Sequence, residues 1–426
     1  MTASRPLRLL FCTYEGGGHV GPMLLTAQDA QARGHAVRVL SDACNAPDAE
    51  ALGLPFEAWR TAPNRADKAP AGDPLRDWEA DNPAEQISGL CERLLIGPAV
   101  EYALDLRAVA AEFQPDVVVA QELLFGVIVG AESLDLPYAL LTANIWCFPT
   151  LPGQPPFGAG LPPSETPEDA ARDAAIAAVT RQLYDFHLDG FNAVRIGFGL
   201  PPLASLLDQP HRAGRILLST ARAFDFAPEP LPEPFRYVGA KVAAPAWSAP
   251  WVSPWPADDP RPLVVVSFST LFQDQADAIR RCIIALEGLD VRAVVTLGPV
   301  LEVQDFPAPD HVLVVKSADH DQLVPQAAAM ITHAGHGTVI RPLRAGVPLL
   351  CLPMGRDQPD NAARVESRGA GLTLPPEAGP SQIAAALTRL LDEPAFRGAA
   401  RRLAERIEAR TGEVEAIDEI EALVLA

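Results

Sequence analysis

Apolar runs alternate with amphipathic segments along the chain, and this alternation predicts strands followed by helices. Residues 7–12 form an apolar run typical of a buried strand, residues 14–18 a glycine loop, and residues 22–33 a helix. Gly34 ends that helix, and residues 36–40 form the next strand. A strand–helix–strand unit of this kind predicts a parallel sheet with a right-handed crossover.

The same unit recurs in the second half of the chain, with a strand at 263–268, a loop at 269–273, a helix at 275–286 and a strand at 291–297. We therefore expect an α/β protein with two Rossmann-like domains, each a doubly wound parallel sheet. Two such domains facing each other would bring the loops after their strands into one cleft.

Proline and helical spacing predict the domain boundaries. Prolines crowd residues 228–262, which excludes a regular helix or a central strand and indicates an interdomain linker. Residues 1–227 then form an N-terminal domain, and residues 263–412 a C-terminal domain. Apolar positions at helical spacing in residues 413–426 predict a closing amphipathic helix.

Composition narrows the classes of function. The chain has 426 residues, 48% of them hydrophobic, and a formal net charge of −20. It can bury two cores, but nucleic acid and an anionic membrane surface would repel it. No two of its six cysteines form a Cys-x-x-Cys motif. This spacing favours free thiols in the cytoplasm over a disulfide framework or a zinc site. We expect neither a signal peptide nor a membrane span.

The segment from His333 to Thr338 has the sequence His-Ala-Gly-His-Gly-Thr, which suits a phosphate group. Gly335 and Gly337 let backbone N–H groups approach phosphate oxygens at the start of a helix, where the helix dipole favours an anion. His333 and Thr338 add side-chain donors. His333 and His336 could instead pair on a metal, but the flanking glycines and the threonine fit phosphate better.

Asp357 and Gln358 follow an apolar strand and a turn, so we expect them on a loop that faces the phosphate site. Their acceptors and donors suit sugar hydroxyls. In the first half, residues 16–19 place His19 at a strand-to-helix turn that points into the cleft. An imidazole there can deprotonate a hydroxyl near neutral pH. The alternative roles for His19 are a helix cap and a second phosphate contact.

Asp319 and Asp321 resemble an acidic pair that binds a divalent metal. No further hard ligand is near them in the sequence, so a polar loop before a helix is the preferred interpretation. We therefore predict no metal site.

Together these motifs resemble those of the family 1 inverting glycosyltransferases of the GT-B architecture, close to bacterial natural-product enzymes. The resemblance covers nearly the whole chain. It rests on Gly-Gly-His-Val-Gly-Pro at 17–22, Val-Ser-Phe-Ser-Thr at 266–270, the His-Ala-Gly-His-Gly-Thr loop, and Leu-Pro-Met-Gly-Arg-Asp-Gln-Pro-Asp-Asn-Ala-Ala-Arg-Val at 352–365. The last two motifs, correctly spaced, are the most specific.

The resemblance implies a role for each residue. His19 would be the general base, Asp357 and Gln358 would bind the sugar, and Asn361 would support the sugar loop or the diphosphate. The diphosphate contacts would be Thr270, His333, Gly335, His336, Gly337 and Thr338. A dTDP- or UDP-linked sugar would serve as co-substrate, with no cofactor and no metal. By the same resemblance, residues 1–227 would bind the acceptor and residues 263–412 the nucleotide sugar.

One departure from the family pattern concerns the partner of His19. Family members hold the catalytic histidine with a carboxylate at the end of a strand, but here the strand at 115–120 is followed by Gln121 and then by Glu122. Side chains alternate along a strand, so both can face His19 only if the strand has already ended. Glu122 as the orienting carboxylate is favoured over Gln121 as a neutral hydrogen-bond acceptor, and both stay open.

A second departure is Ser317, which stands where many relatives place a tryptophan that stacks on the nucleobase. Ser317, Ala318 and the rest of the loop at 315–323 would then meet the base through backbone groups and apolar side chains.

We expect an enzyme that moves a hexose from a dTDP- or UDP-sugar to a small hydrophobic acceptor. The alternatives are a nucleotide-sugar epimerase of the same fold and a binding protein that no longer transfers. The acceptor pocket is expected to include the aromatic residues Trp59, Trp78, Trp146 and Phe148. The nucleotide, the linkage and the oligomeric state, a homodimer included, stay open.

Overall fold

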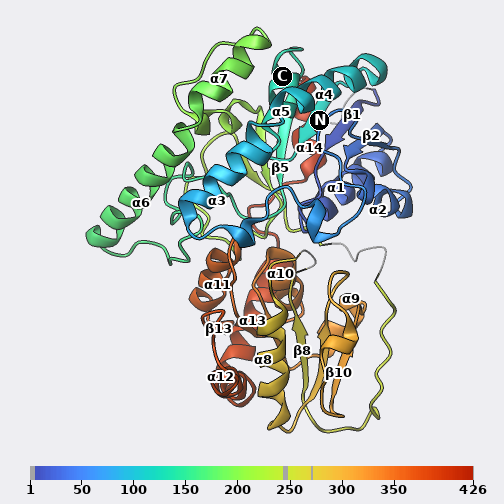
Figure 1. Ribbon diagram of the computed structural model, residues 1–426, viewed down its shortest axis with the longest axis vertical. Coiled ribbons are helices and arrows are strands. Elements are labelled where there is room, and N and C mark those ends of the chain that lie inside the picture. The colour runs from blue at the N-terminus through green and yellow to red at the C-terminus, as the bar shows by residue number, and fades with distance from the viewer. Residues whose placement is uncertain (1–4, 243–247, 270–271, 426) are drawn as a thin grey trace.

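The computed structural model describes residues 5–242, 248–269 and 272–425 (Figure 1). In these residues the strands form two parallel sheets, one of seven strands and one of six. The first sheet lies in the upper half of Figure 1 and the second in the lower half, so the chain forms two α/β domains stacked end to end.

The N-terminal sheet has the strand order β3-β2-β1-β4-β5-β6-β7. Its strands are β1 (Arg8–Cys12), β2 (Ala36–Ser41), β3 (Phe56–Ala58), β4 (Val117–Ala120), β5 (Tyr138–Thr142), β6 (Arg215–Leu218) and β7 (Phe235–Tyr237). The central strands are buried on both faces, which explains why they are continuous apolar runs rather than alternating ones.

The C-terminal sheet has the order β10-β9-β8-β11-β12-β13. Its strands are β8 (Leu263–Ser267), β9 (Arg292–Thr296), β10 (Val312–Val315), β11 (Ala329–Thr332), β12 (Leu349–Cys351) and β13 (Gly371–Thr373). In both sheets the order reverses direction beside the first strand, and this switch point is where open parallel sheets bind ligands.

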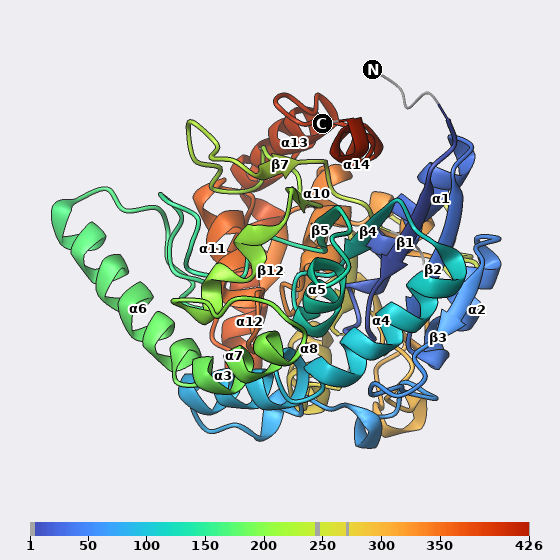
Figure 2. The same cartoon turned by 90° about the horizontal axis from the view of Figure 1, so that it is seen from above.

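Helices cover both faces of each sheet (Figures 1 and 2). They are α1 (Val20–Ala32), α2 (Ala46–Ala51), α3 (Pro83–Leu90), α4 (Ala99–Phe113), α5 (Phe125–Glu132), α6 (Pro167–Asp185), α7 (Leu188–Gly197), α8 (Ala276–Glu287), α9 (His320–Leu323), α10 (His336–Arg344), α11 (Gln358–Ser367), α12 (Pro380–Asp392), α13 (Pro394–Glu408) and α14 (Ala416–Leu425). None of the helices in the described part of the chain is long and apolar enough to cross a membrane. The six cysteines are free thiols.

The predicted linker contains a strand that the sequence analysis did not anticipate. Residues 235–237 form β7 at the edge of the N-terminal sheet, where they pair with β6. Phe235 and Tyr237 are each 1% exposed, so their burial outweighs the surrounding prolines. Pro234 directly precedes the strand, which is a position that an edge strand tolerates.

Helix α14 packs on the N-terminal domain rather than on the domain that precedes it in sequence. Ile417 and Ile420 lie in one apolar cluster with Leu9 of β1 and Val117 of β4. The buried imidazole of His35 contacts Glu421 at 2.9 Å. Figures 1 and 2 both show α14 beside the N-terminal sheet, so the chain crosses between the domains a second time at its end.

A buried ion pair joins the two domains. Asp225, between β6 and β7, accepts a hydrogen bond of 2.7 Å from Arg364 Nε on α11, and the two residues are 1% and 3% exposed. The Tyr237 hydroxyl also donates to Asp225, at 2.7 Å, and Gln154 Nε2 donates at 3.0 Å. Burial acts to raise the pKa of Asp225, but the charge of Arg364 and these hydrogen bonds hold it below its usual range.

Replacing Arg364 should therefore destabilise the protein strongly. Arg364→Ala leaves a buried charge without its partner, and we expect the free energy of unfolding to fall by about 3–5 kcal/mol in urea titrations at pH 7. The control is Arg389→Ala, which breaks an exposed ion pair with Glu393 and should leave the free energy of unfolding nearly unchanged. Equal effects of the two substitutions would show that the Asp225 pair does not hold the domains together.

Candidate active site

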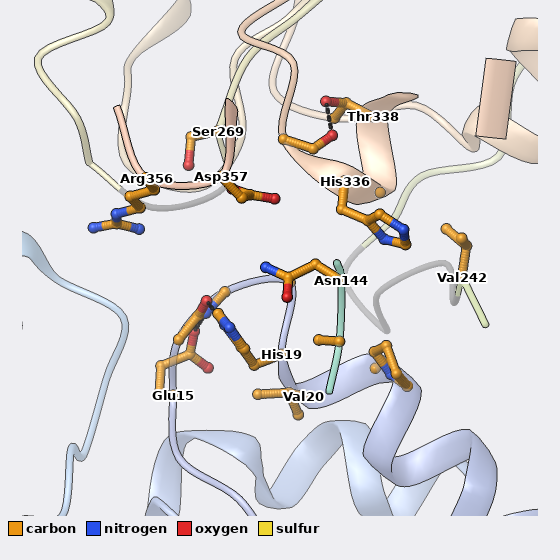
Figure 3. Close-up of a pocket in the computed structure, with 18 of the residues that line it drawn as sticks. Glu15, His19, Val20, Asn144, Val242, Ser269, His336, Thr338, Arg356 and Asp357 are labelled. Carbon is orange, nitrogen blue, oxygen red and sulfur yellow. Dashed lines mark hydrogen bonds between the residues drawn. The ribbon is translucent and has the colours of Figure 1, made fainter. Parts of the chain in front are cut away.

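A cavity of about 310 Å³ lies between the two domains. Loops at the C-terminal ends of β1 and β5 form its wall on the N-terminal side, and loops after β8, β11 and β12 form the opposite wall. Figure 3 shows His19 and Asn144 on one side facing Asp357 and His336 on the other. The cleft predicted from the two repeated units is therefore present as a cavity.

His19 stands at the start of α1 and faces the cavity (Figure 3). Its side chain caps no helix N–H. Instead its Nδ1 lies 2.8 Å from the backbone oxygen of Gly16. A carbonyl oxygen can only accept, so Nδ1 carries the hydrogen and Nε2 is left as the basic nitrogen. The ring also stacks on Tyr14, with 5.7 Å between ring centroids.

Burial lowers the pKa of His19 from the ordinary value of 6.5, and the hydrogen bond to Gly16 only partly opposes this effect. The imidazole is therefore neutral at pH 7, which is the form that a base requires.

Neither predicted partner of His19 is hydrogen-bonded to it in the described part of the chain. The Gln121 side chain turns back on its own loop, where Oε1 accepts a hydrogen bond of 2.8 Å from Leu123 N. Glu122 Oε1 lies 4.0 Å from the thiol of Cys147, and burial raises the pKa of Glu122 to about 8. Strand β4 ends at Ala120, so both residues lie in the turn that follows it. The hydrogen bond that the His19 ring makes is the one with the Gly16 carbonyl.

The predicted phosphate loop forms the start of α10. Gly335 is its N-cap and supplies no side chain, so the first N–H groups of the helix are available to a ligand. A Cβ at position 335 would lie 2.4 Å from Nε2 of His333, which explains the need for glycine. The Thr338 hydroxyl donates to the Gly335 oxygen at 2.8 Å and thus stabilises the loop rather than pointing a donor outward.

Both histidines of this loop line the cavity. Burial lowers the pKa of His333 and of His336 to about 4, so each is neutral at pH 7. His333 stacks on Phe268 with centroids 6.1 Å apart. His336 Nε2 lies 2.8 Å from the Thr220 hydroxyl of the N-terminal domain. His336 therefore links the two domains as well as lining the site.

Asn361 links the loop that carries Asp357 and Gln358, which is the predicted sugar loop, to the predicted phosphate loop at 333–338. Its Nδ2 donates to Asp357 Oδ2 at 2.8 Å and to the backbone oxygen of Ala334 at 3.0 Å. Gln358 uses both ends of its amide inside the protein, with Met354 N at 2.7 Å and Gln273 Oε1 at 2.9 Å. In this structure Gln358 supports the loop, and Asp357 is the more exposed of the two at the cavity.

Two residues that were not predicted from the sequence, Arg356 and Asn144, also line the cavity. Arg356 has a φ of +57°, which is rare outside glycine, and its NH2 group lies 2.6 Å from Asp77 in the short helix η3 (Asp77–Glu79) of the other domain. That partner is distant in sequence, so no local pattern indicates it. Asn144 could have been found, because it lies just after a buried strand, where ligand-binding residues collect.

The predicted acceptor aromatics are mostly core residues. Trp59 is 2% exposed and donates from Nε1 to the Thr13 carbonyl at 3.2 Å. Trp146 and Phe148 pack against each other inside the N-terminal core, with centroids 5.2 Å apart. Trp78 differs, because it packs edge-on against Phe272 of the C-terminal domain at 5.3 Å. None of the predicted four is among the described residues that line the cavity.

The expected nucleobase region is covered by the linker. Ser317 Oγ accepts from Ala249 N at 3.2 Å, and the Ala318 carbonyl accepts from Ser248 Oγ at 3.1 Å. Thr270, predicted to contact the diphosphate, lies outside the described residues. Asp319 caps α9 and Asp321 pairs with Arg341 at 2.8 Å, as expected for a polar loop. Within residues 5–242, 248–269 and 272–425, no group of three or more His, Cys, Asp or Glu side chains is placed to hold a metal.

Comparison with known proteins identifies the class of protein that this fold and cleft define. Residues 281–423 match the family model of the erythromycin biosynthesis protein CIII-like C-terminal domain. The chain is 32% identical to 4'-demethylrebeccamycin synthase of Lentzea aerocolonigenes, over 98% of this chain and 99% of the relative.

Solved structures with the same fold include the calicheamicin glycosyltransferase CalG4, with a TM-score of 0.73 and 21% identity over 99% of this chain and 98% of that one. Another is the spinosyn rhamnosyltransferase SpnG complexed with thymidine diphosphate. Its TM-score is 0.66, with 19% identity over 95% of this chain and 96% of that one. The fold is GT-B, as predicted. The chain belongs to the family 1 glycosyltransferases of the natural-product group.

The loop geometry predicts that Gly16 is essential for activity. A Cβ at position 16 would lie 2.7 Å from His19 Nδ1 and 2.8 Å from the Tyr14 ring, so Gly16→Ala must displace the imidazole. We expect kcat to fall by about 10²-fold, because a displacement near 1 Å of a reacting group has effects of that size. Gly18→Ala is the matched control, since a Cβ there meets nothing within 4 Å. Similar kcat values for the two variants would contradict the role given to the Gly16–His19 contact.

Proposed function

We propose that the protein transfers a hexose from a dTDP- or UDP-sugar to a hydroxyl of a small hydrophobic, natural-product-like acceptor, with inversion at the anomeric carbon and with His19 as the general base. The observation that carries the proposal is the free Nε2 of a neutral, half-buried His19 facing Asp357 and the start of α10 across one cavity. The proposed base, sugar site and phosphate site would thus share this cavity.

The donor would bind mainly to the C-terminal domain. Its diphosphate would lie at the start of α10, where the first-turn N–H groups and the helix dipole favour an anion, with His333 beside it. Asp357 would accept hydrogen bonds from sugar hydroxyls, and Asn361 holds that carboxylate in place. The thymidine diphosphate complex of SpnG supports a nucleoside diphosphate as the leaving group.

The reaction would proceed as one displacement. The acceptor oxygen attacks the anomeric carbon from the face opposite the nucleoside diphosphate, while its proton passes to Nε2 of His19. The Gly16 carbonyl accepts the Nδ1 hydrogen throughout and so stabilises the imidazolium that forms. Negative charge grows on the departing phosphate, and the α10 N-terminus stabilises it with fixed dipoles.

We propose that the reaction requires neither a metal nor a cofactor, because helix N–H groups and neutral imidazoles can take the role of a cation at the leaving group. The free thiols agree with a cytoplasmic location.

Substituting His19 separates catalysis from donor binding. His19→Ala should lower kcat by about 10²–10⁴-fold, the usual contribution of a general base, while the Kd for the nucleotide sugar stays within about twofold. Transfer would be followed by mass spectrometry in EDTA, with the His187→Gln variant as a control, since His187 contacts Ser88 away from the cavity. Full turnover by His19→Ala would disprove the proposed base, and loss of activity in EDTA alone would disprove metal independence.

The pH dependence of the reaction follows from the lowered pKa of His19. A base acts in its neutral form, so kcat/KM should rise with pH through that pKa and then level off. The midpoint should lie below 6.5, because burial lowers the pKa in the folded protein. A midpoint clearly above 7 in the pH profile would exclude the buried, neutral His19 as the base.

A further inference from the structure

Asn144 lines the cavity but has no role in the proposed mechanism. It follows β5 by two residues, and the Thr142 hydroxyl fixes that turn by donating to the Asn144 backbone oxygen at 2.8 Å. The next residues, Ile145 and Trp146, are 1% and 2% exposed and anchor the chain beyond it. The Asn144 side chain lies between His19 and Asp357 (Figure 3).

The amide of Asn144 lacks a hydrogen-bond partner for its oxygen. The residue is only 8% exposed, and Oδ1 is buried with no partner among the described residues. Buried polar atoms are almost always paired, because desolvation without a hydrogen bond is unfavourable. An unpaired buried oxygen on the wall of a ligand cavity is therefore expected to be satisfied when the ligand binds.

The position of Asn144 indicates which ligand supplies the missing hydrogen. The attacking acceptor hydroxyl has one hydrogen, and in the proposed mechanism His19 takes it. That hydrogen is not available to Asn144. The transferred hexose must lie between the acceptor oxygen at His19 and the carboxylate of Asp357, which is where Asn144 stands (Figure 3). A hydroxyl on the sugar can donate to Oδ1 and can also accept from the amide N–H group.

We propose that Asn144 determines the choice of donor sugar: it binds a hydroxyl on the face of the hexose turned toward the N-terminal domain, and it disfavours donors that are deoxygenated at that position. This inference rests on the proposed function. Asp357 binds the sugar from one domain and Asn144 from the other, so a full set of hydrogen bonds forms only when both walls meet the hexose. A deoxy position would leave Oδ1 buried and unpaired, and sites built for a hydroxyl reject such analogues strongly.

Donor binding tests the inference without any acceptor. Calorimetry would give Kd values for dTDP-glucose, UDP-glucose and their 2-, 3-, 4- and 6-deoxy analogues with the wild-type protein and with Asn144→Leu, which keeps the size but removes both polar groups. We expect one deoxy analogue to bind the wild type about 10–100-fold more weakly than its parent sugar. In Asn144→Leu the two should bind within about threefold of each other.

The matched control is Val242→Ala, which alters another residue of the cavity wall without removing a hydrogen-bonding group and should keep the wild-type preference. The Kd for dTDP alone should not differ between wild type and Asn144→Leu, because the diphosphate binds the opposite domain. Equal discrimination by wild type and Asn144→Leu would overturn the inference. The inference would also be overturned if Asn144→Leu raised only the KM for the acceptor in the transfer assay, because Asn144 would then bind the acceptor.

These binding data, together with the transfer assay by mass spectrometry, separate this inference from the proposed function. If wild type binds none of the nucleotide sugars, the proposed function fails and the inference fails with it. If donors bind with the expected preference but no acceptor is glycosylated, the assignment of Asn144 stands and the transfer chemistry is wrong.

Discussion

The relative position of the two domains depends on the buried charge of Asp225. A carboxylate that has lost its water needs an opposite charge and hydrogen bonds, and Arg364 of α11 supplies both. The same helix carries Asp360, whose oxygens accept from Gly158 N at 2.6 Å and Gly160 N at 3.0 Å in the other domain. Helix α11 begins directly after Asp357. Because a helix is rigid, pairing Arg364 with Asp225 also sets where Asp357 stands opposite His19.

The proposed diphosphate donor is an anion, although the chain carries a net charge of −20. Cations on its wall have carboxylate partners: Arg356 pairs with Asp77, Lys68 with Glu15 and Asp48, and Lys241 with Asp29. Burial keeps His333 and His336 uncharged. The site would therefore bind the proposed diphosphate mainly through oriented dipoles and N–H groups. Such groups need little rearrangement as charge moves onto the leaving phosphate, which is the condition under which dipoles stabilise a transition state well.

Local patterns allowed the sequence to predict the two sheets, the glycine loops and the loops around His19, His333 and Asp357, because glycine spacing and apolar runs act within a few residues. The predictions failed where the answer depended on distant partners or on side-chain direction. Gln121 turned back at the end of β4, and the burial of Phe235 and Tyr237 made a strand among prolines. Trp59 and Trp146 are core residues, and Asp77, the partner of Arg356, lies in the other domain. Tertiary packing decides such cases, and a single sequence does not display it.

Helix α14 has a consequence for how this fold can be recombined. The chain passes between the domains at the linker and again after α13, where Val414 N donates to the Tyr237 carbonyl and Glu413 accepts from Arg222 N, both at 2.9 Å. The two domains are thus joined by two covalent connections. A hybrid enzyme made by exchanging everything after the linker would bring a foreign α14 onto the native N-terminal sheet. The C-terminal domain could be exchanged cleanly only with a second junction placed before residue 413.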